Sequence, residues 1–142
     1  MSEQKILVLC TGNSCRSQMA EAYLRKFANG KADIYSAGVE VHGLNQNAVK
    51  IMAEDGIDIS KQTSNHVDEY SALSFDFIIT VCDHANEVCP YLPGHAIRIH
   101  HNFPDPAKAI GTVEAIEKSF RSTRDEIKKW CLDFAKERLD SR

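Results

Sequence analysis

Residues 10–17 combine residue types and spacing that could perform nucleophilic chemistry on a tetrahedral oxyanion. Five residues separate a cysteine from an arginine, a serine follows, and the segment reads Cys10, Thr11, Gly12, Asn13, Ser14, Cys15, Arg16 and Ser17. Successive backbone N–H groups of a tight loop form a nest for anions, and the start of a following helix adds the positive end of its dipole. We therefore expect residues 11–17 to bind the oxyanion and Cys10 to attack it.

The side chains of this loop suit that chemistry. Arg16 can donate two hydrogen bonds to one anion, and Gly12 and Asn13 tolerate the positive φ that curls such a loop. These donors are expected to lower the pKa of Cys10, and the Ser17 hydroxyl can donate a hydrogen bond to its thiolate. The residues alone also allow a buried cysteine, a helix-capping serine and a surface arginine. The position of the motif between a strand and a helix favours the catalytic interpretation.

The hydrophobic pattern predicts the elements that position the loop. An apolar run typical of a buried strand ends at Cys10, and a helical pattern follows until Asn29-Gly30. Strands are predicted at 5–9, 33–37, 75–81 and 96–100, and further helices between Asn45 and Gly56 and along 113–134. Strands that alternate with helices predict an α/β fold, a three-layer αβα sandwich whose four-stranded parallel sheet has helices on both faces. Ligands of such sheets bind beyond the carboxyl ends of the strands.

Length and composition exclude several classes of protein. The 142 residues, of which 43 % are hydrophobic and 26 % charged, correspond to a single domain over residues 1–142. A net charge of −3 and the lack of a Lys/Arg run argue against nucleic-acid binding. No apolar run reaches the roughly 20 residues that span a membrane, and the N-terminus does not resemble a secretion signal. We expect a cytoplasmic monomer.

The chain has five cysteines, and this odd number fits reduced thiols better than structural disulfides. Cys82 and Cys89 lie seven residues apart, directly after a predicted strand. From the residues alone they could be a redox pair or two core cysteines without chemistry. A third interpretation makes them zinc ligands with His84 and either His100 or His101, although the spacing matches no common zinc module.

Three further residues complete the candidates. Asp105 precedes a proline in a polar loop, where its carboxyl group could protonate a leaving oxygen, although an Asp-Pro pair is also a common turn. The Cys15 side chain is expected to point away from the anion and to take no part in catalysis. Cys131 lies on the apolar face of the last predicted helix, which indicates a core position.

Residues 8–21 closely resemble the opening of the thioredoxin-coupled arsenate reductases, a family that shares its fold with the low-molecular-weight tyrosine phosphatases. Gln18 stands where those phosphatases usually carry proline, and Ala107-Lys108 replaces the proline and aromatic residues that tend to follow their acid. The resemblance extends to about residue 112 through the segments 43–45, 56–60, 62–64, the Cys82 region and 103–108. It implies a low-molecular-weight phosphatase fold with reductase activity.

The resemblance implies a cascade of thiol reactions for arsenic detoxification. Arsenate, with phosphate and sulfate as analogues, would bind at Arg16 and esterify Cys10, with Asp105 as the general acid. Cys82 would then attack Cys10, which releases arsenite and forms a disulfide, and Cys89 would move the disulfide outward for reduction by thioredoxin. The exchange requires a mobile segment between these cysteines, and its polar residues are expected to form an exposed turn.

Some members of the family bind potassium beside the loop. The residues that match their ligands are Asn13, Glu21 and Ser36, but Asn65 stands where those members have an aspartate. The resemblance implies no permanently bound cofactor. Because of Asn65, it implies a potassium ion only weakly. A second departure follows Cys82, where the family often has Gly-Asp and this chain has Asp83-His84.

The sequence leaves two other functions open. A low-molecular-weight tyrosine phosphatase would use the same loop, because arsenate and phosphate are nearly isosteric. The Cys82/Cys89 pair and the missing aromatic residues after Asp105 argue against it, although a weak phosphatase side activity fits the reductase interpretation. A non-catalytic oxyanion-binding thiol sensor would not need Cys10, Arg16 and Asp105 together.

Overall fold

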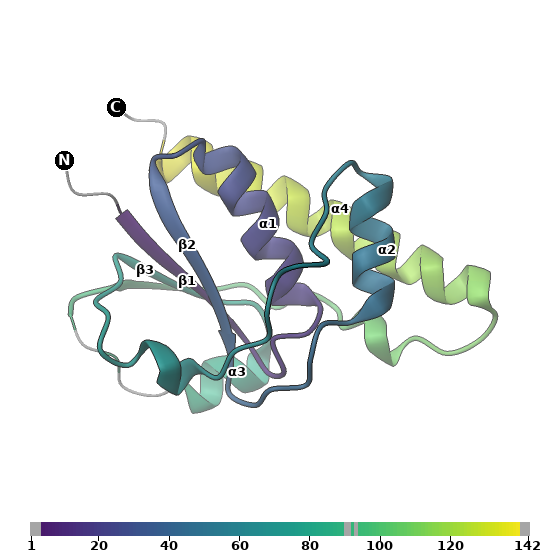
Figure 1. The fold of residues 1–142 in the computed structure, drawn as a ribbon, viewed down its shortest axis with the longest axis horizontal. Coiled ribbons are helices and arrows are strands. Elements are labelled where there is room, and N and C mark those ends of the chain that lie inside the picture. The colour runs from purple at the N-terminus through teal and green to yellow at the C-terminus, as the bar shows by residue number, and fades with distance from the viewer. Residues whose placement is uncertain (1–3, 90–91, 93, 140–142) are drawn as a thin grey trace.

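The computed structural model of the protein describes residues 4–89, 92 and 94–139 (Figure 1). Its centre is a sheet of four parallel strands in the order β2-β1-β3-β4, which confirms the predicted sheet. The strands are β1 (Gln4–Cys10), β2 (Ala32–Gly38), β3 (Phe77–Thr80) and β4 (Ile97–His100). The helices are α1 (Arg16–Ala28), α2 (Gln46–Glu54), α3 (Asp83–Val88) and α4 (Val113–Arg138), with short 3-10 helices η1 (Val67–Tyr70) and η2 (Pro106–Lys108).

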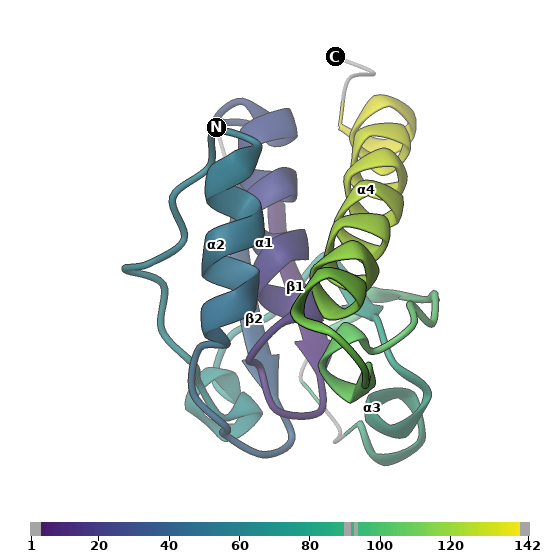
Figure 2. The same ribbon diagram turned by 90° about the vertical axis from the view of Figure 1, so that its right-hand side faces the viewer.

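Helical segments cover both faces of the sheet, as the alternating pattern predicts. On one face α1 packs against the strands and against α4, and α2 lies beside them (Figure 2). The Ser36 hydroxyl of β2 donates a hydrogen bond to Glu21 of α1, so the adjacent side chain of the strand, Tyr35, points to the other face. There its ring lies edge-on to Tyr70 of η1 and to Phe75. The short helix α3 lies at the carboxyl ends of the strands (Figure 1).

The core fixes the end of β1. Residues 6–9 of this central strand are fully buried, because β1 has a strand on each side and a layer on each face. Aromatic rings join the sheet to α4, since Phe77 of β3 lies edge-on to Phe134, which stacks on Trp130. Burial of apolar surface contributes about 25 cal/mol per Å². Cys10, the last residue of β1, is therefore attached to the most firmly packed part of the molecule.

Polar residues set the helix ends where the sequence predicts them. The Asn45 side chain accepts a hydrogen bond from the N–H of Ala48 at the start of α2. Asn29 ends α1 with a φ of 49°, in the left-handed conformation that asparagine tolerates. These local signals explain why element order could be read from the sequence.

The structure departs from the sequence prediction after β3. The strand predicted over 75–81 spans only Phe77–Thr80, and the polar stretch 83–87, expected to form an exposed turn, lies in helix α3. Ala85 is fully buried and anchors this helix, and Asp83 lies in its first turn, where a carboxylate interacts favourably with the helix dipole. The last helix continues beyond the predicted range to Arg138. In the part of the chain that the structure describes, no helix has the length and apolar character required to cross a membrane.

Candidate active site

The carboxyl ends of two neighbouring strands bring two predicted cysteines together. Cys10 ends β1, and Cys82 lies two residues after β3. Both are buried, their sulfurs hydrogen-bond to each other, and the Thr11 hydroxyl lies 3.2 Å from the Cys82 sulfur. A pocket of about 330 Å³ opens beside them, and Arg16 and Asp105 also line it. The structure thus brings four of the five predicted catalytic residues to one place.

The loop after Cys10 is shaped by the segment 39–45, which follows β2. Backbone N–H groups of this segment donate hydrogen bonds to the backbone carbonyls of the loop. The donor and acceptor pairs are Val39 to Cys10, Glu40 to Thr11, His42 to Gly12 and Asn45 to Ser14. Because the C=O and N–H of a trans peptide point in opposite directions, these contacts turn the loop N–H groups toward the interior of the loop. A Cβ on Gly12 would lie 2.2 Å from the His42 ring, so only glycine permits this close approach. The arrangement suits an anion nest.

Asn13 braces the loop from inside. Its φ of 49° curls the chain, as predicted, whereas Gly12, where a positive φ was also considered, does not adopt one. The Asn13 side chain is fully buried. The amide nitrogen donates to the hydroxyls of Ser17, at 2.8 Å, and Ser36, at 3.0 Å, and the amide oxygen accepts from the Asn65 N–H at 2.7 Å. Loop, helix α1 and strand β2 are therefore tied together at one side chain.

Arg16 begins α1 and faces the pocket. Its Nη1 donates to the Phe103 carbonyl at 2.9 Å, and its Nη2 lies 3.5 Å from the Asp105 carboxylate. The Arg16 side chain is only 11 % exposed, so its charge is little screened by water. Both partners lie in the loop after β4, and the Phe103 ring packs between His101 and Trp130. The guanidinium is thus held at the pocket wall.

The two sulfurs share a negative charge in a way that the motif alone does not predict. The hydrogen bond to Cys82 and burial raise the pKa of Cys10, and these effects outweigh Arg16 and the Thr11 N–H, which lower it. Cys82 carries the charge instead. The hydrogen bond from Cys10, the Thr11 hydroxyl, the Ala85 N–H and Arg16 hold its pKa at about 5. The direction of the Cys10 pKa shift is therefore the reverse of the expected one, because a partner sulfur lies against it.

Cys89 and Asp105 are the two other predicted catalytic residues that carry a titratable sulfur or carboxyl group. Cys89 follows the last residue of α3, is partly exposed, and its sulfur lies 2.9 Å from Nη1 of Arg98. Asp105 precedes η2 and accepts a hydrogen bond from the Ala107 N–H at 3.0 Å, which fixes one carboxylate oxygen. The other carboxylate oxygen of Asp105 lies 3.5 Å from Nη2 of Arg16. Thus Cys89 is the predicted catalytic residue that stands apart from the pocket.

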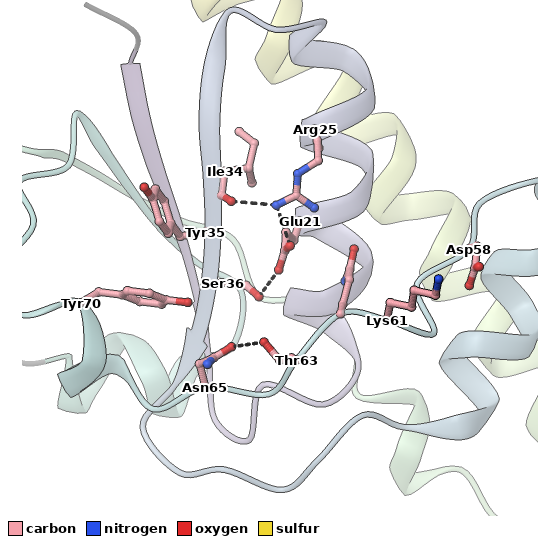
Figure 3. Close-up of a pocket in the computed structure, with 11 residues that line it drawn as sticks. Glu21, Arg25, Ile34, Tyr35, Ser36, Asp58, Lys61, Thr63, Asn65 and Tyr70 are labelled. Carbon is pink, nitrogen blue, oxygen red and sulfur yellow. Dashed lines mark hydrogen bonds and ion pairs between the residues drawn. The ribbon is translucent and has the colours of Figure 1, made fainter.

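Three of the residues considered for potassium, Glu21, Ser36 and Asn65, line one pocket together with the guanidinium of Arg25 (Figure 3). Glu21 Oε1 accepts from the Ser36 hydroxyl at 2.5 Å, and Oε2 pairs with Arg25 at 2.7 Å. The Asn65 oxygen accepts from the Thr63 hydroxyl, and an amide supplies no charge where related proteins would have a carboxylate. With both carboxylate oxygens engaged and a guanidinium beside them, these residues do not fit a potassium ion in this arrangement.

The structure also shows where the two remaining thiols lie and whether the zinc interpretation holds. Cys131 is fully buried against α1, as predicted. Cys15 is also buried, and burial raises its pKa to about 12, so it stays a neutral thiol. Both ring nitrogens of His100 are engaged, by Thr80 and Asp83. Among the described residues, no group of three or more His, Cys, Asp or Glu side chains could hold a metal ion, and the zinc interpretation has no support.

Several residues that shape the site carry no chemical signal in the sequence. Gln18 donates to the carbonyls of Asn13 and Thr63, and Gln62 donates to Gln18 in turn. The Ser64 hydroxyl donates to the Gly12 carbonyl. Gln18 and the segment 62–64 belong to the family resemblance, which was the one available signal. Their role depends on backbone groups distant in sequence, so residue type alone could not reveal it.

Comparison with known proteins agrees with this geometry. Residues 5–142 match the family model described as low molecular weight phosphotyrosine protein phosphatase. An arsenate reductase of Halalkalibacterium halodurans is 51 % identical over 135 residues, which cover 95 % of this chain and 97 % of the relative. One of Bacillus subtilis is 47 % identical over the same shares of both chains.

Solved structures show the same fold. The structure of an arsenate reductase in oxidized state has a TM-score of 0.81 at 28 % identity, and covers 94 % of this chain and 98 % of its own. Vibrio vulnificus Wzb in complex with benzylphosphonate has a TM-score of 0.76 at 20 % identity, covers 96 % and 99 %, and bears on the fold alone. The chain therefore belongs to the low molecular weight phosphotyrosine protein phosphatase family and, within it, groups with the bacterial arsenate reductases.

Proposed function

We propose that the protein reduces arsenate to arsenite, with Cys10 as nucleophile and Cys82 and Cys89 as its redox partners. The observation that carries the proposal is that two buried thiols, Cys10 and Cys82, lie at the carboxyl ends of neighbouring strands beside the oxyanion loop and interact with each other. A phosphatase needs one thiol at such a loop, whereas arsenate reduction needs two electrons, which two thiols supply when they form a disulfide. The names of relatives at 51 % and 47 % identity support the same activity. Its biological role is then arsenic detoxification.

The loop binds arsenate through its inward N–H groups, and Arg16 donates two hydrogen bonds to the anion. To do so, Arg16 exchanges its contacts with Phe103 and Asp105 for contacts with the anion. Phosphate and sulfate are tetrahedral analogues of the substrate. A related structure, 29 % identical, is of an arsenate reductase in the phosphate binding state, which supports this mode of binding.

In the first step, Cys10 forms a sulfur–arsenic bond and one arsenate oxygen leaves as water. The proton that the two sulfurs share moves from Cys10 to Cys82, so the negative charge lies on Cys10 as it attacks. Asp105 supplies the proton to the leaving oxygen as general acid. Its carboxyl group lines the pocket, and it can hold a proton once Arg16 has exchanged its contact with Asp105 for contacts with the anion.

In the second step, the Cys82 sulfur attacks the Cys10 sulfur. A disulfide forms, the sulfur–arsenic bond breaks, and its electron pair reduces arsenic from the +5 to the +3 state. Arsenite leaves with the proton that Cys82 held. The Cys89 thiolate then attacks Cys82, so the disulfide moves to Cys82–Cys89 and Cys10 leaves as a thiolate. The partial exposure of Cys89 supports its position at the end of this cascade.

A dithiol protein of the thioredoxin class returns the two electrons and two protons to the Cys82–Cys89 disulfide. Cys10, Cys15, Cys82 and Cys131 are thiols in the structure, and none of them forms a disulfide, which fits a reducing compartment such as the cytoplasm. All the proposed catalytic groups come from one chain, so the proposed reaction needs only a monomer. No step uses a metal ion.

The proposal is tested by arsenate-dependent oxidation of NADPH in the presence of thioredoxin and thioredoxin reductase. We expect sustained turnover with arsenate and none with phosphate. Cys82→Ser is the matched control, because it keeps the anion loop and removes the electron donor. Rapid hydrolysis of para-nitrophenyl phosphate without NADPH oxidation would favour a phosphatase, since the loop is shared. Binding of phosphate with neither activity would favour a thiol sensor.

A further inference from the structure

Three side chains on one side of the fourth strand attach helix α3 to it. Backbone N–H groups of His101 and Phe103 continue the pairing of β4 with β3, so Arg98, His100 and Asn102 are alternate residues of one extended chain and leave the same side of it. In the structure all three contact α3 or the residue that follows it. We call them the β4 clamp.

The clamp holds both ends of the helix. At its start, Nε2 of His100 lies 2.7 Å from the Asp83 carboxylate, and the Asn102 side-chain oxygen accepts a hydrogen bond from the Asp83 N–H at 3.1 Å. At its end, Nη1 of Arg98 lies 2.9 Å from the Cys89 sulfur. The residues between the two redox cysteines are thus attached to one strand at both ends.

His100 is itself well fixed. Its Nδ1 lies 2.7 Å from the hydroxyl of Thr80, its register partner in β3, and that buried hydroxyl lies 3.4 Å from Asn86 of α3. The imidazole therefore links the sheet to the helix. Asp83, in contrast, has a side chain that is 72 % exposed. A contact between a fixed ring and an exposed carboxylate can break without disturbing the core.

We propose that His100 is a positioning residue for thiol exchange, and that the β4 clamp is closed while Cys82 attacks and open while Cys89 attacks. This rests on the proposed function. The clamp keeps α3 folded, and the folded helix presents the Ala85 N–H to the Cys82 sulfur. Together with the Thr11 hydroxyl, this contact aims Cys82 at Cys10.

The second exchange requires the opposite state. Cys82 and Cys89 flank α3, and a helix rises about 1.5 Å per residue, so helical geometry separates them by about 10 Å. A disulfide needs Cα atoms about 4.4–6.8 Å apart. The helix must therefore unwind, and at least one of the contacts Asp83–His100 and Cys89–Arg98 must break. The clamp stabilises the geometry of the first exchange and opposes the second.

The first test uses the reduced protein without arsenate. Amide hydrogen exchange in α3 should become about two- to fivefold faster in Asp83→Ala and in His100→Gln, the size expected for the loss of one exposed polar contact. Asp83→Asn keeps an acceptor for the ring N–H and should restore part of the protection.

His95→Gln is the matched control, because His95 is exposed just before β4 and has no hydrogen bond or ion pair with any other described residue. Unchanged exchange in both Asp83→Ala and His100→Gln would overturn the clamp.

The second test follows one turnover by rapid quenching and mass spectrometry. In Asp83→Ala and His100→Gln, release of arsenite should slow about two- to fivefold, and migration of the disulfide from Cys10–Cys82 to Cys82–Cys89 should accelerate by a similar factor. A merely structural role would change both rates in the same direction, and that result would contradict the proposal. If the wild-type protein reduces no arsenate, the proposed function fails, whereas the exchange experiment still decides whether the clamp exists.

Discussion

The oxyanion loop (residues 10–17) and the redox segment (residues 82–89) meet at one pair of sulfurs, but they are held in different ways. In the loop, the carbonyls of residues 10–14 all accept hydrogen bonds from donors outside it, and Asn13 and Ser17 are fully buried. In the redox segment, the helix is short and its attachment depends on side chains that are partly or largely exposed.

This difference matches what the two regions have to do. The loop has to keep its shape while charge develops on a bound oxyanion, because preorganised donors stabilise that charge without rearrangement. In the proposed mechanism the redox segment has to change shape, because two sulfurs must reach Cys82 in turn. A rigid anion site next to a weakly held thiol segment is what distinguishes a reductase of this fold from a phosphatase, which needs only the first.

The largest effect should come from removal of the nucleophile in the rigid region. Cys10→Ser should abolish arsenate reduction and any phosphatase side activity, because one sulfur attacks both oxyanions. Steady-state NADPH oxidation and hydrolysis of para-nitrophenyl phosphate measure the two losses. More than about a tenth of either activity in the variant would contradict the assignment, since loss of a catalytic nucleophile typically costs several orders of magnitude.

The second prediction separates the two cysteines of the mobile region. Cys89→Ser should release one arsenite per enzyme and then stop as a Cys10–Cys82 disulfide, because nothing moves the disulfide outward. Cys82→Ser should release none from the first adduct. Mass spectrometry of alkylated enzyme after one equivalent of arsenate identifies the linked cysteines. Sustained turnover of Cys89→Ser with thioredoxin would show that the pair has no role in the cascade.

The third prediction tests whether proton transfer belongs to the rigid side of the site. Asp105→Asn should slow formation of the arsenic adduct about 10²- to 10⁴-fold, the usual contribution of a general acid. Asparagine can still accept the hydrogen bond from the Ala107 N–H, so the local turn should persist. Reduction of a preformed Cys82–Cys89 disulfide by thioredoxin serves as the control and should not change. An equal slowing of both reactions would argue for a structural role instead.

The same comparison shows which features a sequence reveals. The strand, the loop motif and the helix caps are local, so the apolar run before Cys10, the spacing to Arg16 and the cap at Asn45 predict them correctly. Helix α3 is not local. Six residues rich in polar groups have no apolar period, and their conformation depends on the buried Ala85 and on contacts with β4. Sequence reasoning therefore expected a turn where tertiary contacts stabilise a helix.

The candidate site divides in the same way into local features, which the sequence predicts, and non-local features, which it does not. The motif contains its own anion donors, whereas the approach of Cys82 to Cys10 depends on the order of the strands, and only the family resemblance indicated it. The direction of the Cys10 pKa shift was reversed for this reason. The expectation considered only the loop donors, whereas the dominant effect is the hydrogen bond that the Cys10 thiol donates to the sulfur of Cys82, which lies far along the chain.

The fourth prediction concerns the pH dependence of the contact between the two regions. With a pKa of about 5, Cys82 should remain a thiolate at neutral pH, and its alkylation should decline only as the pH falls through about 5. Thr11→Val removes a hydrogen bond that favours this thiolate, so the midpoint should rise by about one pH unit. Peptide mass spectrometry after timed alkylation at several pH values measures the midpoint. The Cys15→Ser variant serves as the control, and its midpoint for Cys82 should match that of the wild type.

The smallest effect should come from the cysteine that lies within the loop but outside the chemistry. Cys15 precedes α1, its carbonyl accepts the hydrogen bond from the Met19 N–H, and burial raises the pKa of its thiol to about 12. Because a neutral buried thiol is a poor nucleophile, it should resist alkylation while Cys82 reacts. Cys15→Ser keeps the backbone contact and supplies a hydroxyl at a helix start, where serine is favoured. Its kcat should therefore stay within about threefold of the wild type, which corresponds to less than about 1 kcal/mol of barrier. A loss as large as that of Cys82→Ser would mean that the redox chemistry extends into the oxyanion loop, and the division between a rigid and a mobile region would no longer hold.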